Sequence, residues 1–106
     1  MVTVLNLAVC LFPNVTALDY QGPVELFGFL SKSVQQLKYI PDSPVNIGIT
    51  YVAYTKDPVV PQSGPRIVPD TTYEDAIHGE QFDIIFVPGG MTSDSSETSD
   101  ALHLTF

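Results

Sequence analysis

The sequence predicts an α/β fold built on an open, mostly parallel sheet. Three segments, residues 2–12, 45–55 and 82–90, are apolar and contain many β-branched and aromatic side chains, which is typical of strands buried on both faces. Helix signals lie between these segments. The order strand, helix, strand, hairpin, short helix, strand favours an α/β sheet over an all-β or all-α architecture.

Composition indicates one small domain or part of a larger one. The chain has 106 residues, of which 44% are hydrophobic and 15% charged, and its net charge is -8. This hydrophobic share is enough for a core. The four cations, Lys32, Lys38, Lys56 and Arg66, are scattered, whereas phosphate binding needs clustered cations. We therefore expect neither a nucleic-acid nor a membrane partner.

The first predicted strand, residues 2–12, is too short to cross a bilayer, which takes about 20 apolar residues. It also lacks the basic start of a signal peptide. Cys10 is the one cysteine of the chain, so an internal disulfide is excluded and a reducing compartment is favoured. We expect a cytoplasmic protein.

The next elements are a helix and a second strand. Gly22-Pro23 is predicted to open the helix, because a proline in the first turn loses no hydrogen bond. This helix should end before Pro41. Residues 45–55 then form the second strand.

A hairpin is expected after the second strand. Residues 59–60 and 67–68 flank a Ser63-Gly64 turn, and three prolines keep the pair at the edge of the main sheet, because proline cannot donate to a strand ladder.

A short helix and the third strand follow. Thr71 and Glu74 have the spacing of a capping box, and Gly79 is a suitable stop. Residues 82–90 form the third strand, which ends in Pro-Gly-Gly. We assign residues 1–90 to the domain and residues 91–106, rich in Ser, Thr and acids, to a flexible polar tail.

Several chemistries lack support in the sequence. Cys10 lies inside an apolar strand, where a thiol is usually a small buried hydrophobe of low reactivity. His78 and His103 have no partner at metal-ligand spacing, so we expect no metal site and no cofactor. The serines after Gly90 lack the G-x-S-x-G context of a serine hydrolase.

One candidate site remains, at the carboxyl edge of the sheet. Asp19 lies just past the first strand and Gly89-Gly90 just past the third, so the two places should be close, at the edge where open α/β sheets bind ligands. Glycine N–H groups there can hold an oxyanion, and the acid can move a proton. Alternatively, Asp19 only caps a helix and the glycines only make a turn. Spacing alone favours this alternative.

Three segments together resemble a known family. NLAVCLFPNVTALDYQGPVELF, SGPRIVPDTTYEDA and FDIIFVPGG are similar to the ThiJ/PfpI (DJ-one) family of the class I glutamine amidotransferase-like superfamily. The first loop, with the form L-D-x-x-G-P-x-E, resembles the isonitrile hydratase-like branch. The resemblance extends from Leu5 to Gly90.

The resemblance implies a flavodoxin-like three-layer sandwich with a nucleophilic cysteine on a strand-to-helix elbow. Asp19 matches the acid that faces this cysteine, and Gly90, with Gly89 beside it, matches the backbone that holds the oxyanion. Gly22, Pro23 and Glu25 match the G-P-x-E motif, with a structural role. Full-length members are expected to be homodimers acting on a small molecule.

In the family, the elbow cysteine lies well after the Pro-Gly-Gly turn. This sequence has no cysteine there. We therefore expect a truncated fold, with three core strands and an edge hairpin, that is inactive alone and binds a small-molecule substrate only if completed. In the flavodoxin-like strand order, 2-1-3-4-5, residues 83–87 would lie at an open edge. An alternative function is the ligand-sensing module of a transcriptional regulator.

Overall fold

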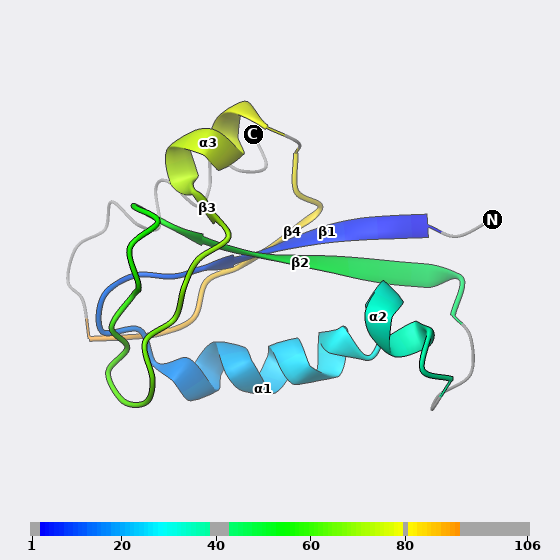
Figure 1. Ribbon diagram of the computed structural model, residues 1–106, viewed down its shortest axis with the longest axis horizontal. Helices are drawn as coiled ribbons and strands as arrows, with labels where there is room; N and C mark the ends of the chain where they lie inside the picture. Colours follow the sequence, from blue (N-terminus) through cyan, green and yellow to red (C-terminus); the bar gives the residue numbers. More distant parts are fainter. Residues whose placement is uncertain (1–2, 39–42, 80, 92–106) are drawn as a thin grey trace.

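The computed structural model describes residues 3–38, 43–79 and 81–91, and these form one parallel sheet with helices on both faces (Figure 1). The elements, in chain order, are β1 (Thr3–Cys10), α1 (Ala17–Gly28), α2 (Lys32–Gln35), β2 (Val45–Ala53), β3 (Thr71–Thr72), α3 (Tyr73–His78) and β4 (Ile84–Phe86). The predicted α/β class is confirmed.

The sheet has the strand order β3-β2-β1-β4, with every pair parallel. The central strand, β1, pairs with β2 from Thr3↔Val45 to Cys10↔Val52 and with β4 from Leu7↔Ile84 to Val9↔Phe86. The predicted neighbours of the first strand are therefore correct. The sequence did not predict β3, which has only two residues.

Each edge strand is held at its start by an aspartate that pairs reciprocally with the neighbouring strand. Asp70 donates its N–H to the Tyr51 carbonyl at 2.8 Å and accepts the Tyr51 N–H on Oδ2 at 2.8 Å. Asp83 makes the same pair of bonds with Asn6, at 2.9 and 2.8 Å. A carboxylate thus takes the place of a strand carbonyl at both sites and begins the ladder there.

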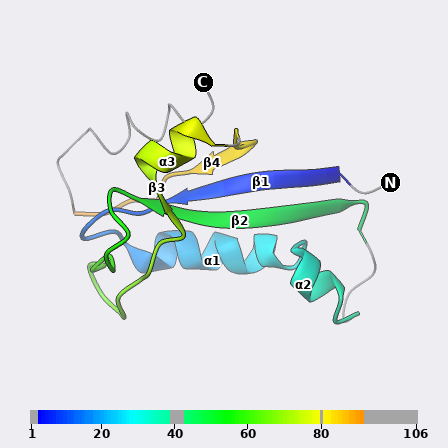
Figure 2. The ribbon, with the colours of Figure 1, turned by 45° about the horizontal axis from the view of Figure 1, so that its top comes forward.

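Side-chain alternation along the strands divides the core into two layers. The odd-numbered residues Leu7 and Val9 belong to a cluster that includes Tyr20 and Val24 of α1. The even-numbered Ala8 and Cys10 and Val52 pack with Tyr73 and Ala76 of α3. Figures 1 and 2 show α1 and α2 on one side of the sheet and α3 on the other. This arrangement follows from the period of two in a strand.

The start of the first helix was predicted wrongly. Helix α1 begins at Ala17, so Pro23 lies inside it and Asp19 lies in its first turn. The loop before Ala17 is fixed by hydrogen bonds of Asn14 and Thr16 to distant segments, and the helix begins directly after them. Pro23 has no N–H, so α1 lacks the hydrogen bond that would run from residue 23 to the carbonyl of Asp19 four residues back.

The expected single helix before Pro41 is two helices in the structure. Helix α1 ends at Gly28, and Ser31 then caps α2 by accepting the Val34 N–H on its hydroxyl at 3.4 Å. The turn between the helices is tied to the sheet, because the Ile47 N–H donates to the Leu30 carbonyl at 2.9 Å. This bond to β2 favours a turn over a continued helix.

The hairpin forms, but as a single antiparallel bridge. Val59 and Ile67 exchange N–H···O bonds of 2.7 and 2.9 Å, and Gly64 at the tip has a φ of 103°. Instead of hanging off the edge, Val59 is buried in the α1-side core, and the Asn14 N–H donates to the Val60 carbonyl at 2.9 Å.

The capping signal of the short helix is displaced by one residue. Thr72, and not Thr71, caps α3, and its hydroxyl accepts the Asp75 N–H at 3.1 Å. Thr71 is part of β3, which explains the shift. Gly79 ends the helix as predicted.

The predicted tail, residues 91–106, lies outside the described residues except for Met91, and so does His103. Within the described part of the chain, the helices are all too short or too polar to cross a membrane.

The edge of β4 predicts self-association of the isolated chain. Among the described residues no strand pairs with the outer side of β4, whose three residues are only half-buried, and Val87 beside it is 43% exposed. An open apolar edge is a template for pairing with a second copy. We expect concentration-dependent association in size-exclusion chromatography, which Val87→Lys should reduce because it places a charge beside the edge.

Val68→Lys provides the matched control, because Val68 is 68% exposed and lies shortly before β3, which is at the opposite edge of the sheet from β4. It should leave association unchanged. A monodisperse wild-type monomer with a sharp thermal transition would show that the sheet needs no partner at this edge.

Candidate functional site

The loop after β1 is bound to the segment after β4 by a short antiparallel bridge between Val15 and Gly90. The Thr16 N–H donates to the Gly89 carbonyl at 2.9 Å, and the Met91 N–H donates to the Asn14 carbonyl at 3.1 Å. Asn14 has a φ of 66°, a left-handed conformation that turns the chain away from β1. The bridge joins the carboxyl ends of two neighbouring strands.

The bridge brings Asp19 and Gly89 into contact. The Gly89 N–H donates to Asp19 Oδ2 at 3.2 Å, across 70 positions of sequence. Asp19 is the third residue of α1, after the N-cap Thr16, whose own side chain makes no capping bond. An acid in the first turn also interacts favourably with the helix dipole. The carboxylate nevertheless bonds a distant glycine, so capping alone does not describe its role.

Close approach, and not a turn, requires glycine at Gly90, and at Gly89 it limits the space only towards the end of the Asp19 side chain. Neither has a positive φ; among the described glycines only Gly64 does. A Cβ on Gly89 would lie 2.8 Å from Asp19 Oδ2, and one on Gly90 would lie 2.5 Å from Phe12 Cε2 and 2.9 Å from the Asn14 carbonyl oxygen. Any side chain at Gly90 would have to displace the buried ring of Phe12.

The two glycine N–H groups differ in availability. That of Gly89 is engaged by Asp19, whereas the Gly90 N–H has no acceptor among residues 3–38, 43–79 and 81–91. Gly89, Gly90 and Asp19 are all exposed, so a ligand can reach them. The arrangement offers one backbone donor for a developing negative charge, with a carboxylate one residue away.

The G-P-x-E residues lie on the exposed side of α1. Glu25 Oε1 accepts the Gln21 side-chain N–H at 3.1 Å, one helical turn away. A Cβ on Gly22 would meet nothing within 4 Å, so space does not require glycine there. Burial raises the pKa of Tyr51, and the charges of Tyr20, Asp70 and Glu25 raise it further. Glu25 thus bonds Gln21 and acts on Tyr51 only through its charge.

Cys10 does not belong to this site. Its side chain is 1% exposed and packs in the layer between the sheet and α3, on the face opposite α1. Burial raises the pKa of the thiol to about 11, although a hydrogen bond with Tyr73 opposes the shift. Cys10 is therefore protonated at neutral pH and has no path to Asp19.

Two residues of the site were missed from the sequence. Phe12 packs against Gly90, and the backbone of Asn14 bonds Val60 and Met91. In the sequence, these two residues stand out only as an aromatic residue and an asparagine on either side of Pro13. No group of three or more metal-binding side chains occurs among the residues that the structure describes. His78 lies in the last turn of α3.

The fold and this site define a class: an α/β domain with an acid and a backbone donor at the carboxyl edge of a parallel sheet. The DJ-1/PfpI family model matches residues 6–105, so the chain belongs to the DJ-1/PfpI family. The match continues past Gly90, where the resemblance in the residue pattern ended. No curated protein matches the chain.

Two solved structures are similar in fold. A ThiJ/PfpI family protein from Pseudomonas syringae is 24% identical with a TM-score of 0.63, covering 94% of this chain and 36% of its own. A DJ-1 superfamily protein from Agrobacterium tumefaciens is 19% identical with a TM-score of 0.53, and the match covers 91% of this chain and 42% of that protein. The four-stranded parallel sheet is consistent with the flavodoxin-like fold of this superfamily. The chain spans less than half the length of either protein.

Alanine at the two glycines should have different effects on stability. Gly90→Ala should lower the free energy of unfolding by about 1–3 kcal/mol, because the new Cβ meets a buried ring and a backbone oxygen. Gly89→Ala meets only the end of the exposed Asp19 side chain, which can swing away, so it should cost less. Urea denaturation of both variants measures the difference.

Gly22→Ala is the control, because nothing lies within 4 Å of its Cβ position and alanine favours a helix. It should be neutral or stabilising. If Gly90→Ala proved as stable as Gly22→Ala, the close packing of Phe12 on Gly90 would be refuted.

The Cys10 thiol should make stability fall at alkaline pH. Its pKa is 9.0 when unperturbed and about 11 in the fold. The protonated thiol therefore contributes fully to the free energy of unfolding below pH 9.0, and this contribution is lost as the pH rises towards 11. Between about pH 8 and about pH 10.5 this amounts to roughly 2 kcal/mol. Cys10→Ala should show a smaller loss in urea denaturation over the same range, because the variant lacks the thiol but keeps Tyr20 and Tyr51, whose pKa shifts do not involve Cys10.

Labelling of Cys10 by a thiol reagent at neutral pH should also be slow while the fold is intact. Rapid stoichiometric labelling of the folded chain would contradict the burial of this thiol.

Proposed function

We propose that the chain supplies the acid and oxyanion part of a thiol-dependent site that hydrates isonitriles or hydrolyses related small polar molecules. In hydration, the isonitrile carbon gains the oxygen of water, and the product is an N-substituted formamide. Asp19 would hold or move the proton, and the Gly90 N–H would bind the negative charge that develops. The nucleophilic thiol would have to come from outside these 106 residues, since their one cysteine, Cys10, is buried on the opposite face of the sheet.

The observation that carries this proposal is the bond from the Gly89 N–H to Asp19 Oδ2, beside a Gly90 N–H that has no acceptor in the described part of the chain. The bond fixes an acid next to a backbone donor, and the Val15–Gly90 bridge holds both. Preorganised donors of this kind are usually the largest contribution to stabilising a transition state. The likeness of the L-D-x-x-G-P-x-E loop to isonitrile hydratase-like proteins supports the reaction class.

Further parts of the proposal concern setting and partners. The scattered cations and the charge of -8 support a small-molecule substrate and argue against nucleic acid and membranes. The single cysteine supports a cytoplasmic location. A homodimer is proposed for the assembled protein by analogy with its family.

The test is to sequence the gene beyond the codon for Phe106 and to assay both the 106-residue chain and the longest encoded chain. We expect turnover of isonitriles or amides only where a cysteine elbow is present. Asp19→Asn should then lower kcat about a hundredfold or more, because it removes a positioned acid–base group of nearly the same shape.

Glu25→Gln is the matched control, since Glu25 is an exposed acid on the same helix that bonds only Gln21 among the described residues. It should leave kcat unchanged. Turnover by the 106-residue chain, abolished by Asp19→Asn, would contradict the need for an added thiol. A helix-turn-helix segment in place of the elbow would support the sensor function instead.

A further inference from the structure

The outer edge of β2 is unpaired over its middle residues. At one end of the ladder between β1 and β2, the Thr3 N–H donates to the Pro44 carbonyl at 2.8 Å. At the other end, the Leu11 N–H donates to the Val52 carbonyl at 2.7 Å. Because backbone groups alternate between the two sides of a strand, the even-numbered residues of β2 bond β1, and the odd-numbered ones point away from it.

Other parts of the chain close this outer edge at two points. Near its start, the Ile47 N–H donates to the Leu30 carbonyl at 2.9 Å. Near its end, Tyr51 exchanges two bonds with Asp70. Between these points, the Ile47 carbonyl and both backbone groups of Ile49 have no hydrogen-bond partner in the described part of the chain. The gap therefore offers two acceptors and one donor, which an added strand of about three residues would satisfy.

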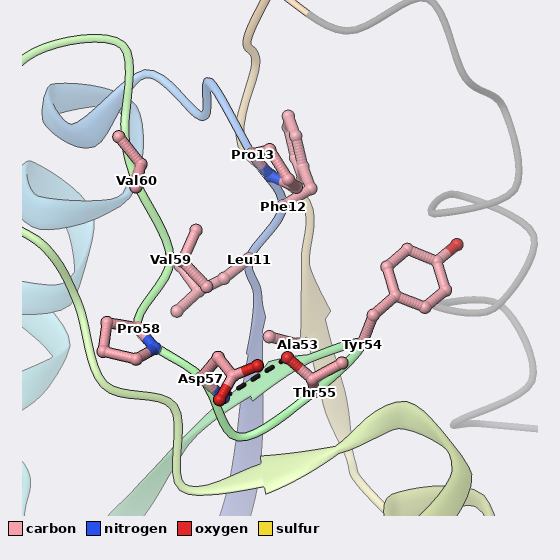
Figure 3. A pocket seen from close by; sticks show the side chains of 10 residues that line it. All are labelled: Leu11, Phe12, Pro13, Ala53, Tyr54, Thr55, Asp57, Pro58, Val59 and Val60. Carbon is pink, nitrogen blue, oxygen red and sulfur yellow. Dashed lines mark hydrogen bonds between the residues drawn. The ribbon is translucent and has the colours of Figure 1, made fainter.

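The carboxyl end of β2 has no comparable gap. The last two residues of the strand pair with β3. The loop that follows bonds within itself, since the Thr55 hydroxyl accepts the Asp57 N–H at 3.3 Å (Figure 3). The unpaired stretch is thus limited to Ile47 and Ile49.

This stretch lies in a groove of about 680 Å³ between β2 and α2. The volume is in the range of about 300–1,000 Å³ that is typical of ligand sites. Lys32 and Gln36, from α2 and its C-cap, line the groove together with Ile47 and Ile49. Figures 1 and 2 show α2 beside the first half of β2. Extended peptides bind other domains by adding a strand to an open edge of this kind.

The charge around the groove is opposite to that of the whole chain. The net charge is -8, yet Lys32 is the one charged residue that the structure shows lining the groove. Residues 26–56 contain one acid, Asp42, and three of the four cations of the chain, Lys32, Lys38 and Lys56. An acidic side chain of a docked segment would therefore find a cation here and few carboxylates that repel it.

We propose that the gap in the edge of β2 is a docking site for an extended acidic segment of another protein. The backbone of this segment would bond the Ile47 carbonyl and Ile49, and an acidic side chain would pair with Lys32. Because α2 forms one wall of the groove, a single extended chain fits the gap better than the sheet edge of a second folded copy. Asp19 and Gly90 follow the carboxyl ends of other strands, so this inference does not depend on the proposed reaction.

The test is an NMR titration of the isotope-labelled 106-residue chain with the peptide acetyl-TVEVT-amide. The Ile49 amide signal should shift, because its N–H gains an acceptor. Its hydrogen exchange should slow roughly tenfold at a free peptide concentration ten times Kd. Acetyl-TVKVT-amide should bind about fivefold more weakly, because the lysine replaces an exposed ion pair by a repulsion. Acetyl-TPEPT-amide should not bind, because proline cannot donate to the ladder.

Lys32→Glu should reverse the preference between the first two peptides. Lys56→Glu is the matched control, because it changes the net charge equally and Lys56 does not line the groove. It should leave the preference unchanged. Both lysines are exposed, so both variants should fold, which circular dichroism checks.

Three results would overturn the proposal. The first is the absence of any shift at Ile49, or shifts confined to Ile84–Phe86, which would place strand addition at the β4 edge instead. The second is equal affinity for the acidic and basic peptides, which would reject an acidic partner. The third is protection of the Ile49 N–H that rises with protein concentration without peptide, which would show that a second copy fills the gap.

Discussion

The bridge between Val15 and Gly90 is the constraint on which the site depends. It joins the exits of β1 and β4, and it sets where α1 begins, because the helix starts directly after the Thr16 N–H reaches the Gly89 carbonyl. Without it, Asp19 would be an acid in a first turn with no defined neighbour. With it, two segments 70 positions apart form one acid–amide pair.

Exposure limits what this pair can do in the described part of the chain. Asp19, Gly89 and Gly90 all face solvent, where a hydrogen bond to a developing charge is weakened by the high dielectric constant of water. Catalytic electrostatics acts most strongly in a site from which water is excluded. The geometry therefore provides orientation, whereas desolvation has to come from whatever covers this edge of the sheet.

The sequence predicted the strands correctly, because their apolar runs are a strong local signal. It failed at the start of α1, where hydrogen bonds to distant backbone segments determine the structure. The apolar runs predicted β1, β2 and β4 and their order, because burial on both faces leaves a continuous hydrophobic segment. Pro23 misplaced the start of α1, since the propensity rule contains nothing about the bridge that begins the helix. Asp19 and Gly89 were predicted as neighbours from topology, but Phe12, which explains Gly90, carries no sequence signal of its own.

The alternation along β1 has a consequence for how the length of this protein can change. Odd-numbered residues serve the α1 layer and even-numbered ones the α3 layer, so a one-residue insertion within Thr3–Cys10 would exchange the two sets and move Cys10 to the opposite face. The hairpin tip around Gly64 has no such parity, because it is exposed and lies beyond the Val59–Ile67 bridge, outside the sheet. Length variation among homologues should therefore be absent from the central strand and concentrated at this tip.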